Sequence, residues 1–598
     1  MSVADPEQPT APSPPVHCTE GAVDASEPPP SGHLDDTSDF AHAAQSESPL
    51  RCHPDKCHTS SGEPCTPAEE SHRLTETPTT PIARGSILDD LSARLLNTPR
   101  RLALWYWGAP LLVTLIAAVL RLWNLGSPNS LVFDETYYVK DSWTLVNNGY
   151  ESKWPDKADT GFSQGHVPAF LDAGSYVVHP PLGKWLIGLG MLLFGVDHSF
   201  AWRITTALAG IAAVFLLMML ARRLFSSTAF AVIAGFLLAV DGNAIVMSRI
   251  TLLDNWVMLF GLLSFWFVLL DRQRSLRKLA DRLACAPHHH HWGPAIWNRP
   301  WLFAAAIAVG ATCAVKWSGV WFVLALGLYV VVVDTLERRR LGLRNWAAGG
   351  ILKQGPVSFV LYVPIALVTY LASWTGWFVT TGGWDRSWAM QPGNAATGLW
   401  SWLPKSLQSL WMYHREVYGF HLGVTSPHAA KSSPEQWLFM LHPTNMYYAV
   451  TEDGQAACGA SACADSVMAL GNPLIWWAAA AAVFFLVYRL VRYREWQVAL
   501  ILLGFAAGYL PWFMYLNRTV FAFYSIAFQP YTMLALAYCI WLFLGRASDP
   551  RPRREFRVRV VAVFFGLIII LTVFFYPMWS GMPLSAAARQ LRIWLPGW

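Results

Sequence analysis

Charged residues are scarce in this chain. Only 14% of its 598 residues are Asp, Glu, Lys or Arg, whereas 54% are hydrophobic. Soluble domains carry about a quarter charged residues, so this composition excludes a soluble protein and indicates a polytopic membrane protein. The net charge is only +5, and the basic residues lie in short connectors between apolar segments. We therefore expect a lipid bilayer around the chain and no nucleic-acid partner.

Cysteine is scarce as well. The nine Cys show no repeated Cys-x-x-Cys spacing, which argues against a zinc framework or a disulfide-rich scaffold. We expect neither a metal site nor another cofactor. Cys458 and Cys463 lie in a segment that we place outside the membrane, where an oxidising environment would allow them to form a disulfide. Two free thiols remain the alternative.

Residues 1–97 are rich in Pro, Ser, Thr and acidic residues and have almost no apolar periodicity. Such a segment cannot bury enough surface to offset the entropy of ordering, so we predict a disordered cytoplasmic tail. Residues 98–598 form the membrane domain. We predict about eleven transmembrane helices there, because about twenty apolar residues span a bilayer. They lie near residues 102–122, 200–221, 228–246, 251–270, 301–316, 317–333, 356–374, 473–491, 496–513, 524–544 and 559–577.

The basic connectors set the orientation of these helices. With the N-terminus in the cytoplasm and the C-terminus outside, every cluster of Arg in a connector faces the cytoplasm. This arrangement holds only if the short apolar segment 179–195 is an interfacial or re-entrant helix. Two long segments then face outward, 124–199 and the Trp-rich 377–470 between the seventh and eighth spans. Long ordered loops are usually functional.

An acidic pair, Asp134 and Glu135, directly follows the first span in the segment FDETYYVKDSW. Further ionisable residues far apart in the sequence fall at the same outer face: His179, Lys184, Arg203, Asp254, Lys316 and Arg518. Each cation alone could simply snorkel to the interface. Together with the acids they suit the transfer of a group from a lipid phosphate, because cations stabilise the departing phosphate and a carboxylate accepts the proton of an attacking hydroxyl. Adjacent carboxylates cannot flank one bond, which favours a single displacement with inversion.

Several motifs together resemble one enzyme family. FDETYYVKDSW, VHPPLGKW, FAWR, RITLLDNW, VKWSG and NRTVFAFY occur in this order in the protein O-mannosyltransferases of the GT-C class. The outer segments SWTGWFVTTGGWDRSW, YHREVYGFHLGVTSPHAAKSSPEQWLF and GNPLIWW are similar to the actinobacterial branch. The resemblance covers the chain from about residue 102 onward. The β-trefoil domain of the eukaryotic members has no counterpart here, so acceptor preference cannot be transferred from them.

The resemblance implies a plasma-membrane enzyme with the GT-C fold and an extracytoplasmic active site. Its donor would be polyprenyl phosphate mannose, and its acceptors Ser/Thr hydroxyls of secreted proteins or peptides, which it could meet during translocation. By motif, Asp134 matches the catalytic acid and Glu135 its neighbour near the acceptor. Lys184 and Arg203 match positions near the lipid phosphate; Asp254 and Arg518 match positions whose role is less defined, and we include Arg518 among the phosphate ligands.

Alternatives from other classes remain at this point. Another GT-C transferase would share the fold, but an oligosaccharyltransferase should carry a WWD triplet, and here Trp476 and Trp477 are followed by Ala478. A transporter should show charged residues or broken helices at the bilayer midplane and inverted repeats. No repeat is visible in the sequence.

Overall fold

The computed structural model describes residues 87–285, 291–452, 458–460 and 462–598. Most of the predicted disordered tail lies outside these residues. Its last part is helical: α2 covers Ile87–Leu95, and Ile87 is buried. The amide N–H of Ile87 donates to the carbonyl of Gly545 at 3.4 Å. This corrects the predicted boundary at residue 97, because the apolar residues of this short segment recur at helical spacing.

The described residues contain eight helices that are long and apolar enough to cross a membrane. They are Pro99–Leu122 (α3, η2 and α4), Ser199–Phe225 (α8), Asp254–Cys285 (α11), Trp317–Arg340 (η3 and α13), Trp346–Ser373 (α14, η4 and α15), Pro473–Tyr493 (α19), Trp496–Tyr515 (α20 and η7) and Arg551–Ser580 (α22). Helices α9 (Thr228–Ala239) and α10 (Gly242–Arg249) meet the same criteria only as a pair, and the bend of 62° between them is that of a broken span or of a re-entrant segment. Asp241 causes the break, because its side chain caps α10 by accepting the N–H of Ala244 at 3.2 Å.

Each of the eleven predicted spans overlaps helix in the described residues, but only eight are single helices long enough to cross a membrane, so the count of eleven stays a prediction. Two of the eleven, α12 (Pro300–Val315) and α21 (Gln529–Leu544), have only 16 residues each. The tight turn predicted at Lys316 is confirmed, since α12 ends at Val315 and η3 begins at Trp317. The segment predicted to be interfacial forms α7 (Leu182–Phe194), whose 13 residues are too few to span a bilayer.

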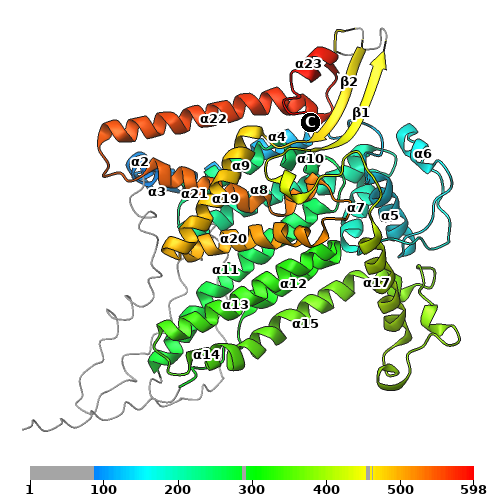
Figure 1. Cartoon of the computed structure of the whole chain (residues 1–598), viewed down its shortest axis with the longest axis horizontal. Helices are drawn as coiled ribbons and strands as arrows, with labels where there is room; N and C mark the ends of the chain where they lie inside the picture. Colours follow the sequence, from blue (N-terminus) through cyan, green and yellow to red (C-terminus); the bar gives the residue numbers. More distant parts are fainter. Residues whose placement is uncertain (1–86, 286–290, 453–457, 461) are drawn as a thin grey trace, which may run out of the picture. The chain divides into compact units, whose positions relative to one another are not determined.

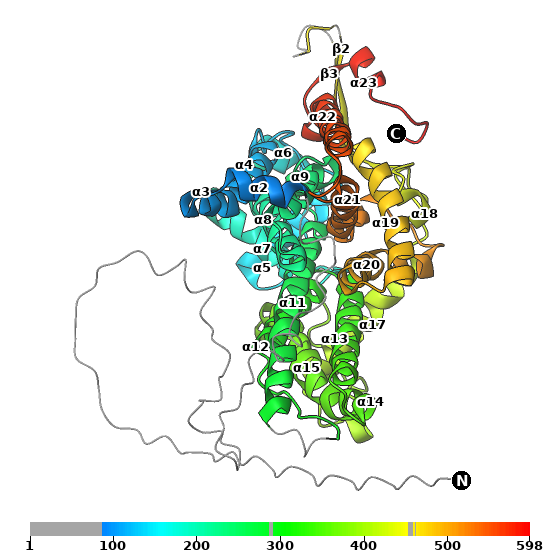
Figure 2. The same ribbon diagram turned by 90° about the vertical axis from the view of Figure 1, so that its left-hand side faces the viewer.

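The chain divides into two compact units. One contains Gln273–Ile296 and Asp334–Gln354. In it the Gln354 side chain accepts the amide N–H of Ile296 at 2.7 Å and donates back to the Ile296 carbonyl at 3.2 Å. The other unit contains the remaining membrane helices and every residue of the candidate site. In this unit α5 (Glu135–Asn148) packs beside α7, and α8 packs against both α4 and α9 (Figures 1 and 2).

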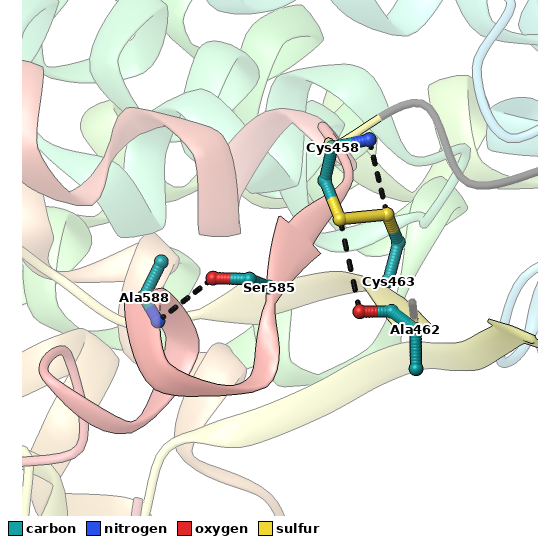
Figure 3. Close-up of a disulfide and its surroundings, with 5 residues drawn as sticks. All are labelled: Cys458, Ala462, Cys463, Ser585 and Ala588. Atoms are coloured by element: carbon teal, nitrogen blue, oxygen red, sulfur yellow. Dashed lines mark hydrogen bonds between the residues drawn. A yellow bond between two sulfur atoms is a disulfide. The ribbon is translucent and has the colours of Figure 1, made fainter. Parts of the chain in front are cut away.

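The segments on either side of the last spans also form a small antiparallel sheet, which the sequence did not lead us to predict. Strands β1 (Thr444–Glu452), β2 (Ala462–Ala469) and β3 (Leu584–Ser585) pair in that order beside α22 and α23 (Ala586–Gln590). Cys458, in the connection between β1 and β2, forms a disulfide with Cys463 of β2, with their Cα atoms 5.9 Å apart (Figure 3). The disulfide ties this connection to the end of β2 that pairs with β3.

Candidate active site

Asp134 is held between two firmly packed neighbours. It occupies the N-cap position of α5, yet its carboxylate makes no capping hydrogen bond. Phe133 adopts a left-handed backbone conformation with φ of 52°, which is unusual for a bulky residue and is found where surrounding packing enforces it. The Phe133 ring makes edge contacts with His428, Phe521 and Phe523 at centroid distances of 5.9, 5.5 and 5.7 Å. These rings determine how the following carboxylate is presented.

Glu135 is held in a different way. Its carboxylate is fully buried and accepts two hydrogen bonds from Arg203, at 2.9 Å from Nε and 2.7 Å from Nη2. The amide N–H groups of Val132 and Thr251 donate to it as well, at 2.9 and 2.8 Å. A buried carboxylate with a bidentate partner and two backbone donors has its hydrogen-bonding capacity used within the protein.

The Arg203 guanidinium is likewise bound entirely within the protein. Its remaining guanidinium hydrogens point to the backbone carbonyls of Leu125, Pro128 and Ser130, at 3.4, 2.8 and 2.9 Å. These carbonyls belong to the loop between α4 and α5, so Arg203 on α8 fixes the loop that leads to Asp134. All five donors of the guanidinium are occupied, which leaves none for a phosphate in this conformation.

The Asp134 carboxylate, by contrast, has no hydrogen bond or ion pair with any residue that the structure describes. Partial burial raises the pKa of Asp134 to about 6, opposed by the nearby positive charge of Lys316 and assisted by the negative charge of Asp254. The Asp134 carboxylate is therefore mostly ionised at neutral pH. Its pKa is still close enough to neutral for the group to accept and release a proton. Such tuning is typical of a general base.

Lys316 and Asp254 form a buried ion pair next to Asp134. The ammonium group donates to both carboxylate oxygens of Asp254, at 2.9 and 3.0 Å, and both side chains are less than a tenth exposed. The Lys316 Nζ also lies 4.1 Å from the centre of the Tyr524 ring. Lys316 occupies the turn between α12 and α13, and Asp254 the first position of α11, so two helix ends place this pair.

A cavity begins at this pair. His179, Asp254, Lys316 and Arg518 all line it, so the structure brings together four predicted site residues that are far apart in the sequence. Much of the remaining lining is apolar and aromatic, with Val320 and Trp321 from α13, Pro511 and Tyr515 from η7 (Leu510–Tyr515), and Tyr418 and Leu422 from α17 (Lys405–Gly423). The cavity thus combines charged side chains with an apolar lining suited to a hydrocarbon chain.

Arg518 is the cation of this cavity without a carboxylate partner among the described residues. Its Nη2 donates to the Nδ1 atom of His421 at 3.1 Å, and its Nε is buried without a hydrogen-bond partner. His421 in turn donates from Nε2 to the carbonyl of Val178 at 2.9 Å. These two bonds fix the neutral tautomer of His421. Burial and the positive charge of Arg518 lower the pKa of His421 to about 4, so this imidazole is neutral at pH 7.

Lys184 lies outside the cavity lining. It pairs with Glu151, and both side chains are almost fully buried. Its Nζ also donates to the carbonyl of His179 at 3.0 Å, so Lys184 supports the backbone at a residue that does line the cavity. Burial and the surrounding positive charges lower the pKa of His179 well below its usual value. This imidazole is therefore neutral.

Sequence reasoning missed three residues of this arrangement. Glu151 stands outside the quoted motifs. His421 lies within one of them, YHREVYGFHLGVTSPHAAKSSPEQWLF, but nothing there singled it out, and the importance of both residues follows only from their contacts with Lys184 and Arg518. Tyr524 belongs to a quoted motif, but nothing indicated that its ring would face Lys316. No group of three or more His, Cys, Asp or Glu side chains suited to a metal ion occurs within the ranges described.

Comparison with known proteins identifies the family. A model of the C-terminal four-transmembrane region of protein O-mannosyltransferases matches residues 406–598, and a model of dolichyl-phosphate-mannose–protein mannosyltransferases matches residues 178–279. The polyprenol-phosphate-mannose–protein mannosyltransferases of Mycolicibacterium smegmatis (strain MKD8) and Mycobacterium tuberculosis (strain CDC 1551 / Oshkosh) are each 32% identical over 82% of this chain. The match covers 93% and 92% of the two relatives. The chain belongs to the protein O-mannosyltransferase family.

A solved structure supports the same assignment at the level of the fold. The Saccharomyces cerevisiae protein O-mannosyltransferase Pmt1–Pmt2 complex bound to the sugar donor aligns with a TM-score of 0.61 at 15% identity. The alignment covers 86% of this chain and 94% of the yeast chain. This family member therefore has the GT-C membrane fold predicted from its motifs.

Proposed function

We propose that this protein transfers mannose from polyprenyl phosphate mannose to Ser or Thr hydroxyls of protein acceptors. Asp134 carries the proposal, because it is an uncompensated, partly buried carboxylate with a raised pKa next to a cavity that contains cations. The names of the relatives support the donor and the kind of acceptor.

In the proposed reaction the acceptor hydroxyl oxygen attacks the anomeric carbon of mannose while the bond from that carbon to the phosphate oxygen breaks. The hydroxyl proton passes to Asp134, and the bonding electron pair leaves with the phosphate. A positioned base contributes about 10²–10⁴-fold to such a step. One displacement inverts the anomeric centre, so a β-linked donor gives an α-mannoside. The single free carboxylate at the site agrees with this mechanism, since a retaining enzyme needs a second carboxylate as nucleophile.

The charged side chains of the cavity form the proposed phosphate site. Arg518 has an unpartnered Nε, and guanidinium groups bind phosphate oxygens in a planar, directional way. Lys316 adds a second positive charge, held in place by Asp254. Two fixed cations stabilise the charge that develops on a departing phosphate without reorganisation at the moment of reaction. The aromatic and apolar lining would then accept the first isoprene units of the donor.

For the other predicted residues we propose roles through position instead of direct contact. Glu135 and Arg203 form a buried clamp that holds the loop before α5, and Lys184 with Glu151 supports the backbone at His179. The phosphate contacts predicted for Lys184 and Arg203 would require breaking these buried pairs, which is costly. Arg518 and Lys316 take that role in our proposal.

We also propose that the reaction takes place at the extracytoplasmic face of the plasma membrane, on secreted proteins. The clustering of basic residues in the opposite connectors supports this orientation. Cys458 and Cys463, joined in the same outer segment, agree with an oxidising compartment.

The test uses membranes that contain the full-length protein, radiolabelled polyprenyl phosphate mannose and a Thr-rich peptide. Label in the peptide with the wild-type protein and none with Asp134→Asn is the expected result. Label that enters sealed vesicles without reaching peptide would indicate a transporter. Label in a lipid or oligosaccharide product instead would indicate a different GT-C reaction.

A further inference from the structure

Helix α17 in the large outer segment has two unlike faces. The inner face binds the ends of neighbouring segments: the Tyr413 hydroxyl accepts the N–H of Val177 at 3.0 Å and donates to its carbonyl at 2.9 Å. His414 accepts a hydrogen bond from the Tyr370 hydroxyl at 2.5 Å. With the bond from His421 to Val178, these contacts fix the rotation of α17 about its own axis. The side chains opposite them are therefore held facing outward.

This outward face is apolar and aromatic. Trp411, Tyr418 and Leu422 are 70%, 53% and 51% exposed, and their spacing places them on one stripe of the helix. The preceding loop adds three more side chains: Leu399, Trp400 and Trp402 are 80%, 59% and 71% exposed. We call these six residues the aromatic face. An apolar cluster of this kind in contact with water is unfavourable and marks a binding surface.

We propose that the aromatic face rests on the lipid bilayer and inserts into its outer interface. Trp and Tyr concentrate at the boundary between hydrocarbon and headgroups, where an amphipathic ring is favoured. Arg415, exposed on the same stripe of α17, is suited to lipid phosphates. The face is thus chemically like an interfacial helix.

The position of α17 supports a lipid partner. Figure 1 shows α17 running across the end of α15 (Gly355–Ser373) instead of continuing its direction. Helix α15 exposes Leu367 and Val368 by 56% and 62%, as a lipid-facing span does, and Val379 just beyond it is 76% exposed. Exposed apolar side chains thus occur both on a span and on the helix that crosses its end, as expected where the chain meets the bilayer boundary. A peptide partner would not account for the exposed side chains of the span.

This contact would have a consequence for the enzyme. Tyr418 and Leu422 also line the candidate cavity, so lipid contact by α17 would hold the cavity mouth at the bilayer surface. Only this consequence rests on the proposed function; the lipid contact itself does not, and it can be tested separately.

The experiment measures the surroundings of single labelled positions in the full-length protein reconstituted in phosphatidylcholine and phosphatidylglycerol vesicles. The seven cysteines other than Cys458 and Cys463 are replaced by Ser, and the disulfide between these two is kept. Trp411→Cys and Trp402→Cys, which lie outside the cavity lining, are then labelled with an environment-sensitive fluorophore. Tyr448→Cys on β1 is the matched control, since Tyr448 is likewise an exposed aromatic residue, 51%, but lies on the sheet. Spin-labelled lipids quench from the bilayer, and iodide quenches from water.

We expect blue-shifted emission at positions 411 and 402, a larger loss of fluorescence with spin-labelled lipid than with iodide, and the reverse order at 448. Equal iodide quenching at all three positions would overturn the proposal. Protection of position 411 only after addition of an acceptor peptide would also overturn it, in favour of a peptide surface. Each labelled variant must retain mannosyl transfer, and Leu399→Cys, which lies outside the cavity lining, replaces any variant that does not. If transfer fails in the parent protein as well, the proposed function is in doubt, but the quenching result still decides the lipid contact.

Discussion

The neighbours Asp134 and Glu135 should respond to neutral substitution in opposite ways. Asp134→Asn keeps the shape of the side chain but removes the base, so transfer should fall about 10²–10⁴-fold, or roughly 3–5 kcal/mol in activation free energy. Its stability should change little, within about 0.5 kcal/mol, because the carboxylate has no hydrogen bond to lose among the described residues. Donor binding should also persist.

Glu135→Gln should instead weaken the fold. The carboxylate balances the buried charge of Arg203 and accepts two backbone N–H groups, and removing one partner of a buried ion pair costs about 3–5 kcal/mol. The loss in transfer should follow from misplacement of Asp134 and from loss of folded protein. Arg203→Met combined with Glu135→Gln should cost less than the sum of the single changes, since no buried charge is then left alone.

The assay pairs two measurements on protein purified in detergent: the thermal inactivation half-life and the initial rate of mannose transfer to a Thr-rich peptide. Near-normal transfer by Asp134→Asn would remove the basis of the proposed mechanism. If Glu135→Gln had a normal half-life and a greater loss of transfer than Asp134→Asn, Glu135 would act directly on the acceptor, as the motif resemblance first implied, and the clamp would be secondary.

Three further outcomes are expected. The rate of transfer should fall as pH drops below about 6, because protonation of Asp134 removes the base. Asp254→Asn removes a negative neighbour of Asp134 and should shift this fall to lower pH, whereas Lys316→Gln removes a positive neighbour and should shift it to higher pH. An unchanged pH profile in both variants would contradict the assignment. Arg518→Ala should raise the donor KM and lower kcat by about 10²–10³-fold, whereas unchanged donor kinetics would exclude it from the phosphate site. Deletion of residues 1–86 should leave transfer in isolated membranes unchanged, and loss of activity at a normal protein level would refute this.

The membrane helices could be predicted from the sequence because lipid imposes a simple rule: about twenty apolar residues satisfy their backbone within one helix. Even the turn at Lys316 was predictable, since two spans must be separated there. The break at Asp241 was not. The carboxylate there accepts N–H groups from Asn472 and Trp476, each at 2.9 Å, and such partners from a distant helix leave no local signal in the sequence.

The sequence predicted that ionisable residues gather at one outer face, but it did not predict how they pair. His179, Asp254, Lys316 and Arg518 were among the residues placed at that face, and all four line one cavity. The sequence could not indicate that Glu135 forms an internal ion pair, because which carboxylate meets which cation depends on the packing of helices far apart in sequence. Two adjacent acids in a motif look equivalent until their partners are known.

The distribution of partners is therefore what separates catalysis from scaffolding here. A buried charge is costly unless it is paired, so most ionisable groups near the cavity are paired: Lys316 with Asp254, Lys184 with Glu151, and Arg203 with Glu135. Asp134 and Arg518, by contrast, have no opposite charge in direct contact among the described residues. One is an acid with a pKa near 6, and the other a guanidinium with an unpartnered Nε. A substrate with a hydroxyl proton to give and a phosphate to release would supply the missing partner of each, and this complementarity is the physical argument for the proposed reaction.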